Sequence, residues 1–159
     1  MPRQTRKIRL KKNNPAWPLK YYKGLTQKAA ATRRKEILKF GALHWKDPRA
    51  YVGFKTDIGV KTRNSSYTRS WNRRFPLAKS LAARSAATGV PLRFIQESYN
   101  RGMAAWRTGH RPGATQQQWG YARVSSFLLC GKTYRTTDAD LAREAKAKSP
   151  AAAAWWSKC

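Results

Sequence analysis

The chain has 159 residues, of which 34 are Lys or Arg and seven are Asp or Glu, so its formal net charge is +27. Such an excess is ordinarily balanced by a polyanionic partner, with nucleic acid as the first candidate and the anionic face of a membrane as the second. A hydrophobic fraction of 41% with 12% aromatic residues excludes a purely disordered basic tail, and no apolar run reaches the about 18 residues of a membrane span.

Residues 1–25 predict an extended basic arm. They hold eight basic residues and no acid, and Pro15 and Pro18 interrupt any helix. We expect the charges to contact phosphates while the aromatic residues dock on a neighbour or stack on bases. A solvated, disordered terminus is the alternative. The aromatic residues concerned are Trp17, Tyr21 and Tyr22.

Residues 26–75 predict a basic helix followed by a strap. Thr26 is a suitable N-cap and Gly41 a suitable stop for the helix TQKAAATRRKEILKF. Its basic cluster, RRK at 33–35, fits a phosphate contact and a solvated helix face equally well. The segment from residue 42 onward shows short β-like alternation broken by glycines, which predicts a small hairpin or an irregular strap with a basic residue every few positions.

Residues 76–148 predict a compact helical domain. One helix should run from Pro76 to Gly89, and a second from Pro91 to Gly109 with an apolar stripe at three- and four-residue spacing. Gly102 and Ala105 are small, so another helix could approach the second helix closely there. The pair could be a helical hairpin of structural purpose, which we favour, or a helix-turn-helix. In the second case the recognition helix would present Arg93, Gln96, Asn100 and Arg101.

The loop TGHRPGAT, residues 108–115, separates this pair from the next helix. Thr115 and Gln118 have the spacing of a capping box, and the helix QQQWGYARVSSFLLC should stop at Gly131. A basic turn begins at Lys132. Thr137 should cap a last helix that ends at Ser149-Pro150, with Asp138 and Asp140 in its first turn, where the helix dipole favours negative charge.

The tail 149–159, SPAAAAWWSKC, predicts a docking segment, because its two adjacent Trp residues would serve little purpose on a free monomer. Cys130 and Cys159 belong to no CxxC or CxxH pattern, so a disulfide framework and a structural zinc site are not expected. We expect Cys130 to be a buried small hydrophobic residue.

Catalysis would have to rely on very few groups. His110 is the best candidate for a general acid or base, and Asp138 with Asp140 could in principle bind Mg²⁺. Helix capping explains both acids, however, and a third carboxylate is missing. We therefore expect no enzyme, no cofactor and no metal site.

The segments GMAAWRTGHRPGAT and QWGYARVSSFL resemble the signature of an uncharacterised family of large DNA viruses of algae and protists and of marine phages. The similarity extends upstream through KGLTQKAAATRRKEI, DPRAY, the KTRNSSYT strap and ATGVP. It implies a viral origin and work associated with the virion or the genome. It implies no established activity and no catalytic residues.

Together these patterns predict a mainly α protein: a helical core of three or four helices, an extended basic N-terminal arm and an irregular or β-hairpin strap. We expect a basic structural component of a viral particle, a minor capsid or internal virion protein made in the host cytoplasm or nucleus. Its arm and Trp155-Trp156 tail would bridge neighbouring capsid proteins and could also bind nucleic acid, with DNA favoured over RNA. The expected anion contacts are Arg33, Arg34, Lys35, Arg107, His110, Arg111 and Lys132.

Three alternatives remain open at this point. The first is a nucleic-acid-binding protein outside the virion, acting through the helix-turn-helix-like pair or the arm. The second is a small phosphodiester-cleaving enzyme that uses His110 and the two Asp residues. The third is an organellar ribosomal protein, which would share the composition.

Overall fold

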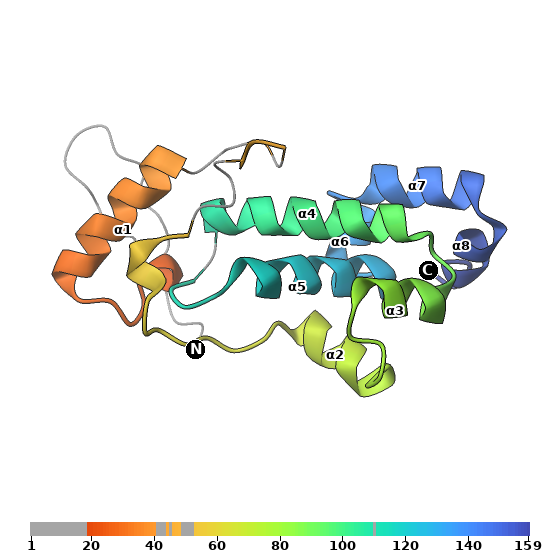
Figure 1. Cartoon of the computed structure of the whole chain (residues 1–159), viewed down its shortest axis with the longest axis horizontal. Helices are drawn as coiled ribbons and strands as arrows, with labels where there is room; N and C mark the ends of the chain where they lie inside the picture. The colour runs from red at the N-terminus through yellow and green to blue at the C-terminus, as the bar shows by residue number, and fades with distance from the viewer. Residues whose placement is uncertain (1–18, 41–43, 45, 49–52, 110) are drawn as a thin grey trace, which may run out of the picture.

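The computed structural model describes residues 19–40, 44, 46–48, 53–109 and 111–159, and within them the fold is mainly α, as predicted (Figure 1). Most of the expected arm, residues 1–18, lies outside the described residues. Within the described part of the chain, two 3-10 helices, η1 and η3, accompany eight α-helices. The elements are η1 (Leu19–Tyr21), α1 (Gln27–Phe40), η3 (Lys55–Asp57), α2 (Ser66–Arg74), α3 (Leu81–Thr88), α4 (Leu92–Gly109), α5 (Gln116–Leu128), α6 (Lys132–Arg135), α7 (Ala139–Lys148) and α8 (Pro150–Trp155).

The long helices α4 and α5 lie side by side and form the central pair of the molecule (Figure 1). Glycines allow this close approach. A Cβ atom on Gly102 would come within 2.9 Å of the Gly120 Cα atom, and one on Gly120 would come within 2.5 Å of the Tyr99 ring. The expectation that another helix approaches α4 at Gly102 is therefore confirmed. Thr115 begins α5 with the predicted capping box, in which the Thr115 hydroxyl and the Gln118 side chain each accept a backbone N–H.

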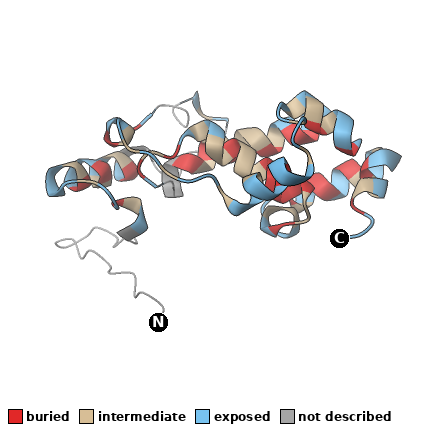
Figure 2. Cartoon of the chain, turned by 90° about the horizontal axis from the view of Figure 1, so that it is seen from below, coloured by how far each residue is buried: buried red, intermediate tan, exposed pale blue. Residues whose placement is uncertain are grey.

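The larger hydrophobic core draws on more of the chain than residues 76–148. It joins Trp71 of α2 to Ile95 of α4, Phe127 of α5 and Trp156 after α8. Figure 2 shows the buried residues along the inner faces of the helices. A satellite cluster at the other end packs Tyr22, Phe54 and Trp106 together with α1. Tyr22 is 4% exposed, so it packs within its own chain, which corrects the expectation that it docks on a neighbour or stacks on bases.

The Ala/Trp tail packs on its own chain, which corrects the expectation that it docks on a neighbour. Trp156 is 2% exposed, and its indole Nε1 donates a hydrogen bond to the Phe127 carbonyl oxygen. Trp155 Nε1 donates to the Leu128 carbonyl oxygen at 2.8 Å. Both indoles therefore cap the carbonyl end of α5 and bury aromatic area in the core.

A disulfide joins Cys130 to Cys159, contrary to the expectation from their spacing. The Cα atoms of the two residues are 5.6 Å apart. Cys130, and not Gly131, takes the left-handed position after α5, with φ 59°. Sequence spacing could not reveal this pair, because the two cysteines are 29 positions apart and α6 to α8 fold back between them.

The strap differs from the predicted hairpin. Within the described part of residues 42–75 there is no strand, and η3 and α2 occupy it instead. Ser65 is the N-cap of α2 and accepts the Thr68 N–H, so local capping favours a helix over strand alternation. The helix expected from Pro76 begins later, at Leu81, because Ser80 supplies its N-cap.

Candidate polyanion-binding groove

A groove of about 740 Å³ lies between the strap and the α4–α5 pair. Residues 62–66 and the first turn of α2 form one wall. Gly102 and Ala105 of α4, with Trp119 and Ala122 of α5, contribute to the opposite side. Arg111 reaches it from the loop before α5, and Lys132 reaches it from the start of α6. We call it the basic groove.

Among the residues that the structure describes, those lining the basic groove include several basic side chains and no acidic one. Five of its basic residues are exposed, and none forms an ion pair with a carboxylate of the described residues. Unpaired cations in a concave surface create a positive potential that attracts a polyanion. The five are Lys20, Arg63, Arg69, Arg111 and Lys132.

Neutral polar and aromatic groups complete the lining. Tyr67 and Trp119 offer ring surfaces, and the hydroxyl and amide groups of residues 62–66 offer hydrogen bonds. The Tyr67 hydroxyl accepts the Lys132 backbone N–H at 3.3 Å, which ties α2 to α6 across the groove. Gly131 permits this contact, because a Cβ there would meet the Tyr67 ring at 2.6 Å. Proteins that bind single-stranded nucleic acid use the same combination of cationic groups for the backbone and aromatic rings for the bases.

Arg123 also lines the basic groove, but its charge is already balanced. Its Nη2 and Nε atoms contact the Asp138 carboxylate at 2.7 and 3.0 Å. Asp138 is fully buried and also accepts hydrogen bonds from Ser98 and Arg101. Arg123 therefore holds the start of α7.

The two acids at the start of α7, Asp138 and Asp140, are ion-pair partners of arginines more than helix caps. Asp138, not Thr137, occupies the N-cap position, and its side chain makes no capping hydrogen bond. Asp140 accepts two hydrogen bonds from Arg101, at 2.9 Å each, and these hold the pKa of Asp140 below its usual value. The same contacts raise the pKa of Arg101. Because arginines occupy both carboxylates, Asp138 and Asp140 give no support to the phosphodiesterase alternative.

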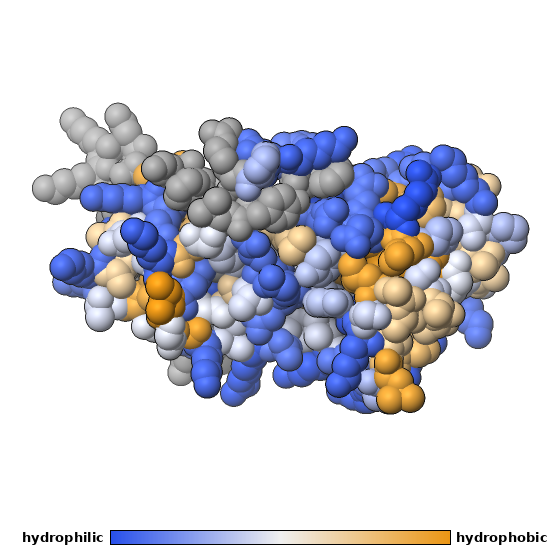
Figure 3. All heavy atoms as spheres, viewed as in Figure 1, coloured by the Kyte–Doolittle hydropathy of each residue, from blue (hydrophilic) through white to orange (hydrophobic). Residues whose placement is uncertain are grey.

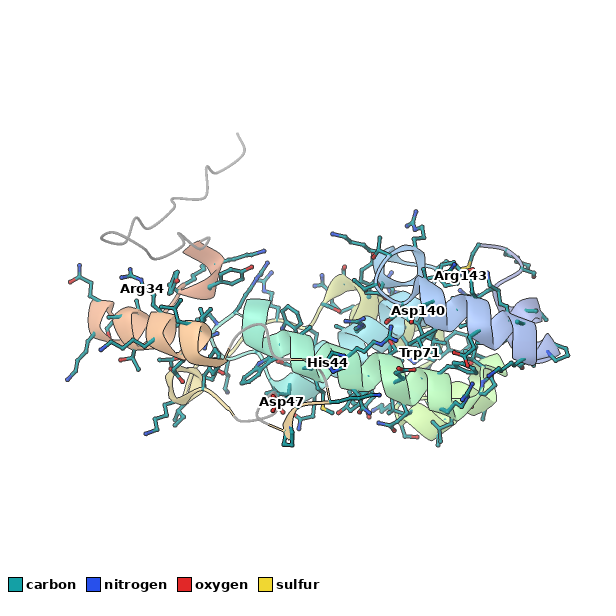
Figure 4. The ribbon with its side chains drawn as sticks, turned by 90° about the horizontal axis from the view of Figure 1, so that it is seen from above. Arg34, His44, Asp47, Trp71, Asp140 and Arg143 are labelled. Carbon is teal, nitrogen blue, oxygen red and sulfur yellow. A yellow bond between two sulfur atoms is a disulfide. The ribbon has the colours of Figure 1, made fainter. Side chains whose placement is uncertain are left out.

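The three basic residues predicted on α1 separate into different environments. Arg33 is 0% exposed, forms an ion pair with Asp57 and donates a hydrogen bond to Thr56. A buried, paired guanidinium cannot meet an external polyanion, so Arg33 is corrected from an anion contact to a structural residue. Arg34 lies over the Tyr22 ring at 5.4 Å, and Lys35 is exposed. In Figure 4, Arg34 lies at the α1 end of the molecule, far from Asp140 on α7.

The structure places two of the four remaining predicted anion contacts in the groove and does not describe the side chains of the other two. Arg111 and Lys132 line the basic groove together. Arg107 lies in the last turn of α4, but its side chain is outside the described structure, as is all of His110. Packing against residue Val60 and a hydrogen bond to Asp57 explain the glycine at position 113 of this loop. A Cβ on Gly113, which has φ +84°, would overlap the Val60 carbonyl oxygen, and the Gly113 N–H donates to Asp57 at 3.2 Å.

The groove residues that the site prediction omitted are Lys20, Arg63 and Arg69. Their only signal in the sequence is a regular basic spacing in the arm and the strap, which cannot show which residues converge.

Two of the four α4 residues that a helix-turn-helix would present to DNA, Arg93 and Arg101, are held in ion pairs. Arg93 pairs with Glu144 at 2.7 Å, and Arg101 binds the carboxylates before and within α7. Gln96 donates a hydrogen bond to Asn100. These contacts favour the structural hairpin over the helix-turn-helix alternative, because Arg93 and Arg101 already have carboxylate partners.

Comparison with protein families matches residues 18–144 to a family of unknown function, DUF5824, and the chain belongs to that family. Comparisons with curated proteins and with solved structures find no match. None of the helices described here has the length and apolar character needed to cross a membrane. Nor do any three His, Cys, Asp or Glu side chains of the described residues gather where they could hold a metal ion.

Proposed function

We propose that this DUF5824 protein is a non-enzymatic structural protein that binds nucleic acid in the basic groove. The observation that carries the proposal is the convergence of five exposed cations on a groove whose described lining contains no acid. None of the five pairs with a carboxylate of the described residues. Each phosphate that such a cation neutralises releases condensed counterions, which favours binding without sequence specificity. Tyr67 and Trp119 supply ring faces on which bases can stack.

The overall charge supports the same proposal. The chain carries +27, and hydrophilic side chains cover much of the face shown in Figure 3. Three of the seven acids, Asp57, Asp138 and Asp140, are held in internal ion pairs with arginines and so do little to balance the charge of the groove. The net field therefore remains available to an external polyanion.

The setting we propose is a viral particle, with DNA as the first candidate ligand. This part rests on the resemblance of GMAAWRTGHRPGAT and QWGYARVSSFL to a family of large DNA viruses and marine phages. The protein would be a minor capsid or internal component, made in the host cytoplasm or nucleus, and its basic N-terminal arm would contact neighbouring capsid proteins. Mass spectrometry of purified particles tests this setting, and absence of the protein from them would refute it.

Photo-crosslinking tests the groove itself. An oligonucleotide carrying 4-thiothymidine, irradiated with the full-length protein, should attach to peptides that contain Tyr67 or Trp119, which line the groove. Crosslinks spread over α1 and α7 in proportion to their basic residues would instead indicate diffuse electrostatic binding. A competition experiment with an excess of anionic lipid vesicles distinguishes nucleic acid from a membrane surface as the preferred polyanion. Crosslinking that persists in the presence of the vesicles would indicate nucleic acid.

A further inference from the structure

A second hollow, of about 520 Å³, adjoins the basic groove and contains a buried arginine. Its lining includes Arg84 of α3, Tyr121 of α5 and Lys79 before α3. Asn64 and Gln118 line both hollows, and the Gln118 amide donates a hydrogen bond to Asn64 at 3.4 Å. The contact between these two side chains therefore lies at the boundary of the two hollows. We call the second hollow the Arg84 pocket.

Arg84 is the least balanced charge in the core. It is 2% exposed, and its guanidinium lies 4.9 Å from the ring centres of both Trp71 and Tyr121. Its Nη1 atom donates to the Ser125 hydroxyl at 2.8 Å, and its buried Nε atom has no hydrogen-bond acceptor. No carboxylate of the described chain forms an ion pair with it, whereas buried Arg33 has Asp57. Burial lowers the pKa of Arg84 to about 10, which is still well above neutrality.

A buried charge without a counterion is costly, and removing it is often neutral or stabilising when an apolar group can fill the space. The two aromatic rings offset part of that cost by cation–π attraction. They do not supply the hydrogen-bond acceptors that a guanidinium seeks, and an oxyanion in the adjoining pocket would do so. The rest of the lining suits the same ligand, since it is composed of amides, hydroxyls and one exposed lysine, with no acid.

We propose that the Arg84 pocket is a binding site for a phosphate group, with Arg84 at its base and Lys79 at its rim. The planar guanidinium matches the oxygen geometry of a phosphate, and Lys79 adds a second charge near the entrance. The shared wall at Asn64 and Gln118 would let one strand place a phosphate here while its neighbours lie in the basic groove. Only this last point, the source of the phosphate, depends on the proposed function.

The test uses the full chain labelled with ¹⁵N-arginine and follows the Arg84 Nε–H resonance by nuclear magnetic resonance. Inorganic phosphate should shift this resonance saturably, and chloride at equal ionic strength should not. Arg143, exposed on α7 and remote from the pocket lining, is the internal control and should show no saturable shift. A linear, unsaturated response shared by Arg84 and Arg143 would overturn the proposal, because it would reflect general screening of a highly charged protein.

Substitutions of Arg84 and Lys79 test whether phosphate binds at this pocket and not elsewhere on the protein. Arg84→Met should lose phosphate affinity by about tenfold or more, since it removes a charge-assisted hydrogen bond. If that variant does not fold, Lys79→Ala at the exposed rim is the second test: it should weaken binding severalfold, while Lys28→Ala on α1 leaves it unchanged. Equal affinities in Lys79→Ala and Lys28→Ala would overturn the proposal.

Two titrations, one with inorganic phosphate and one with an oligothymidine, distinguish the possible sources of the phosphate group. Saturation of the Arg84 shift by inorganic phosphate alone would indicate a small phosphate ligand, and saturation by an oligothymidine alone would indicate a strand. Either result supports the site, and no saturable shift with either ligand refutes it. Arg111→Glu, which damages the basic groove only, should retain the response to inorganic phosphate, so the two proposals can fail independently.

Discussion

Replacing Asp138 by Asn should destabilise the protein without weakening its binding to nucleic acid. Asp138 is fully buried and lies 2.7 Å from the Arg123 guanidinium, 2.8 Å from the Ser98 hydroxyl and 3.4 Å from Arg101. Asn preserves the shape but removes the charge. Arg123 then loses its only carboxylate among the described residues, whereas Arg101 keeps Glu97 and Asp140.

Removing one partner of a buried ion pair costs about 3–5 kcal/mol. Because Arg101 keeps two other partners, we expect the lower end of that range, a loss of about 3 kcal/mol in the free energy of unfolding. For a chain of this size, each kcal/mol lowers the melting temperature by about 2–4 °C, so the expected decrease is about 6–12 °C. Urea unfolding followed by tryptophan fluorescence measures the free energy, and calorimetry measures the melting temperature.

Asp140→Asn is the matched control, because the Asp140 side chain is 55% exposed and contacts Arg101 from the surface. Exposed ion pairs contribute about 0–1 kcal/mol, so this variant should remain within about 1 kcal/mol of the wild type. Oligonucleotide affinity should not fall in Asp138→Asn, since Arg123 at the groove would lose its counter-charge. Equal stabilities of the two variants would refute the view that Asp138 organises the start of α7.

Three further results are expected. Gly102→Val should destabilise the fold by more than about 2 kcal/mol in urea unfolding, because its Cβ would lie 2.9 Å from the backbone of α5, whereas Gly53→Ala, which has open space, should change little. Cys159→Ser should lower the free energy of unfolding by about 3–4 kcal/mol relative to the oxidised protein, from a closed loop of 29 residues, and a reductant should then have no further effect. The stability advantage of wild type over Asp140→Asn should be fully present above about pH 5, which is above the unfolded pKa of Asp140. It should be lost as the pH falls below about 4 and through the folded pKa, because the hydrogen bond from Arg101 lowers the folded pKa of Asp140 below its unfolded value. An advantage independent of pH would contradict this.

Local signals in the sequence predicted the elements better than their arrangement. The capping box at Thr115 and the close approach at Gly102 depend on neighbouring residues or on side-chain size, and both were predicted. The roles of Trp156 and Cys159 were not, because each depends on contacts with residues about 29 positions earlier in the chain. A spacing pattern carries no information on such long-range contacts.

The candidate site shows the same difference between local sequence signals, which could be predicted, and long-range contacts, which could not. Arg111 and Lys132 were predicted from their local basic context and lie in one groove. Arg33 was predicted from the same kind of context but is buried, because Asp57, 24 residues later, pairs with it. Composition also could not distinguish Arg84, an interior cation, from the many arginines on the surface. Charge density predicts the class of partner, whereas the fold decides which charges can meet it.

The salt dependence of oligonucleotide binding tests the central claim most directly. For single strands, the slope of log affinity against log salt concentration is about −0.7 for each phosphate neutralised. Replacing Arg69, Arg111 and Lys132 by Ala should therefore reduce the magnitude of the slope by about 2, because all three lie in the basic groove. The matched variant with Lys28, Arg143 and Lys158 replaced, which removes the same charge from exposed positions outside the groove, should keep the wild-type slope. Equal slopes in the two triple variants would contradict a nucleic-acid site in the basic groove.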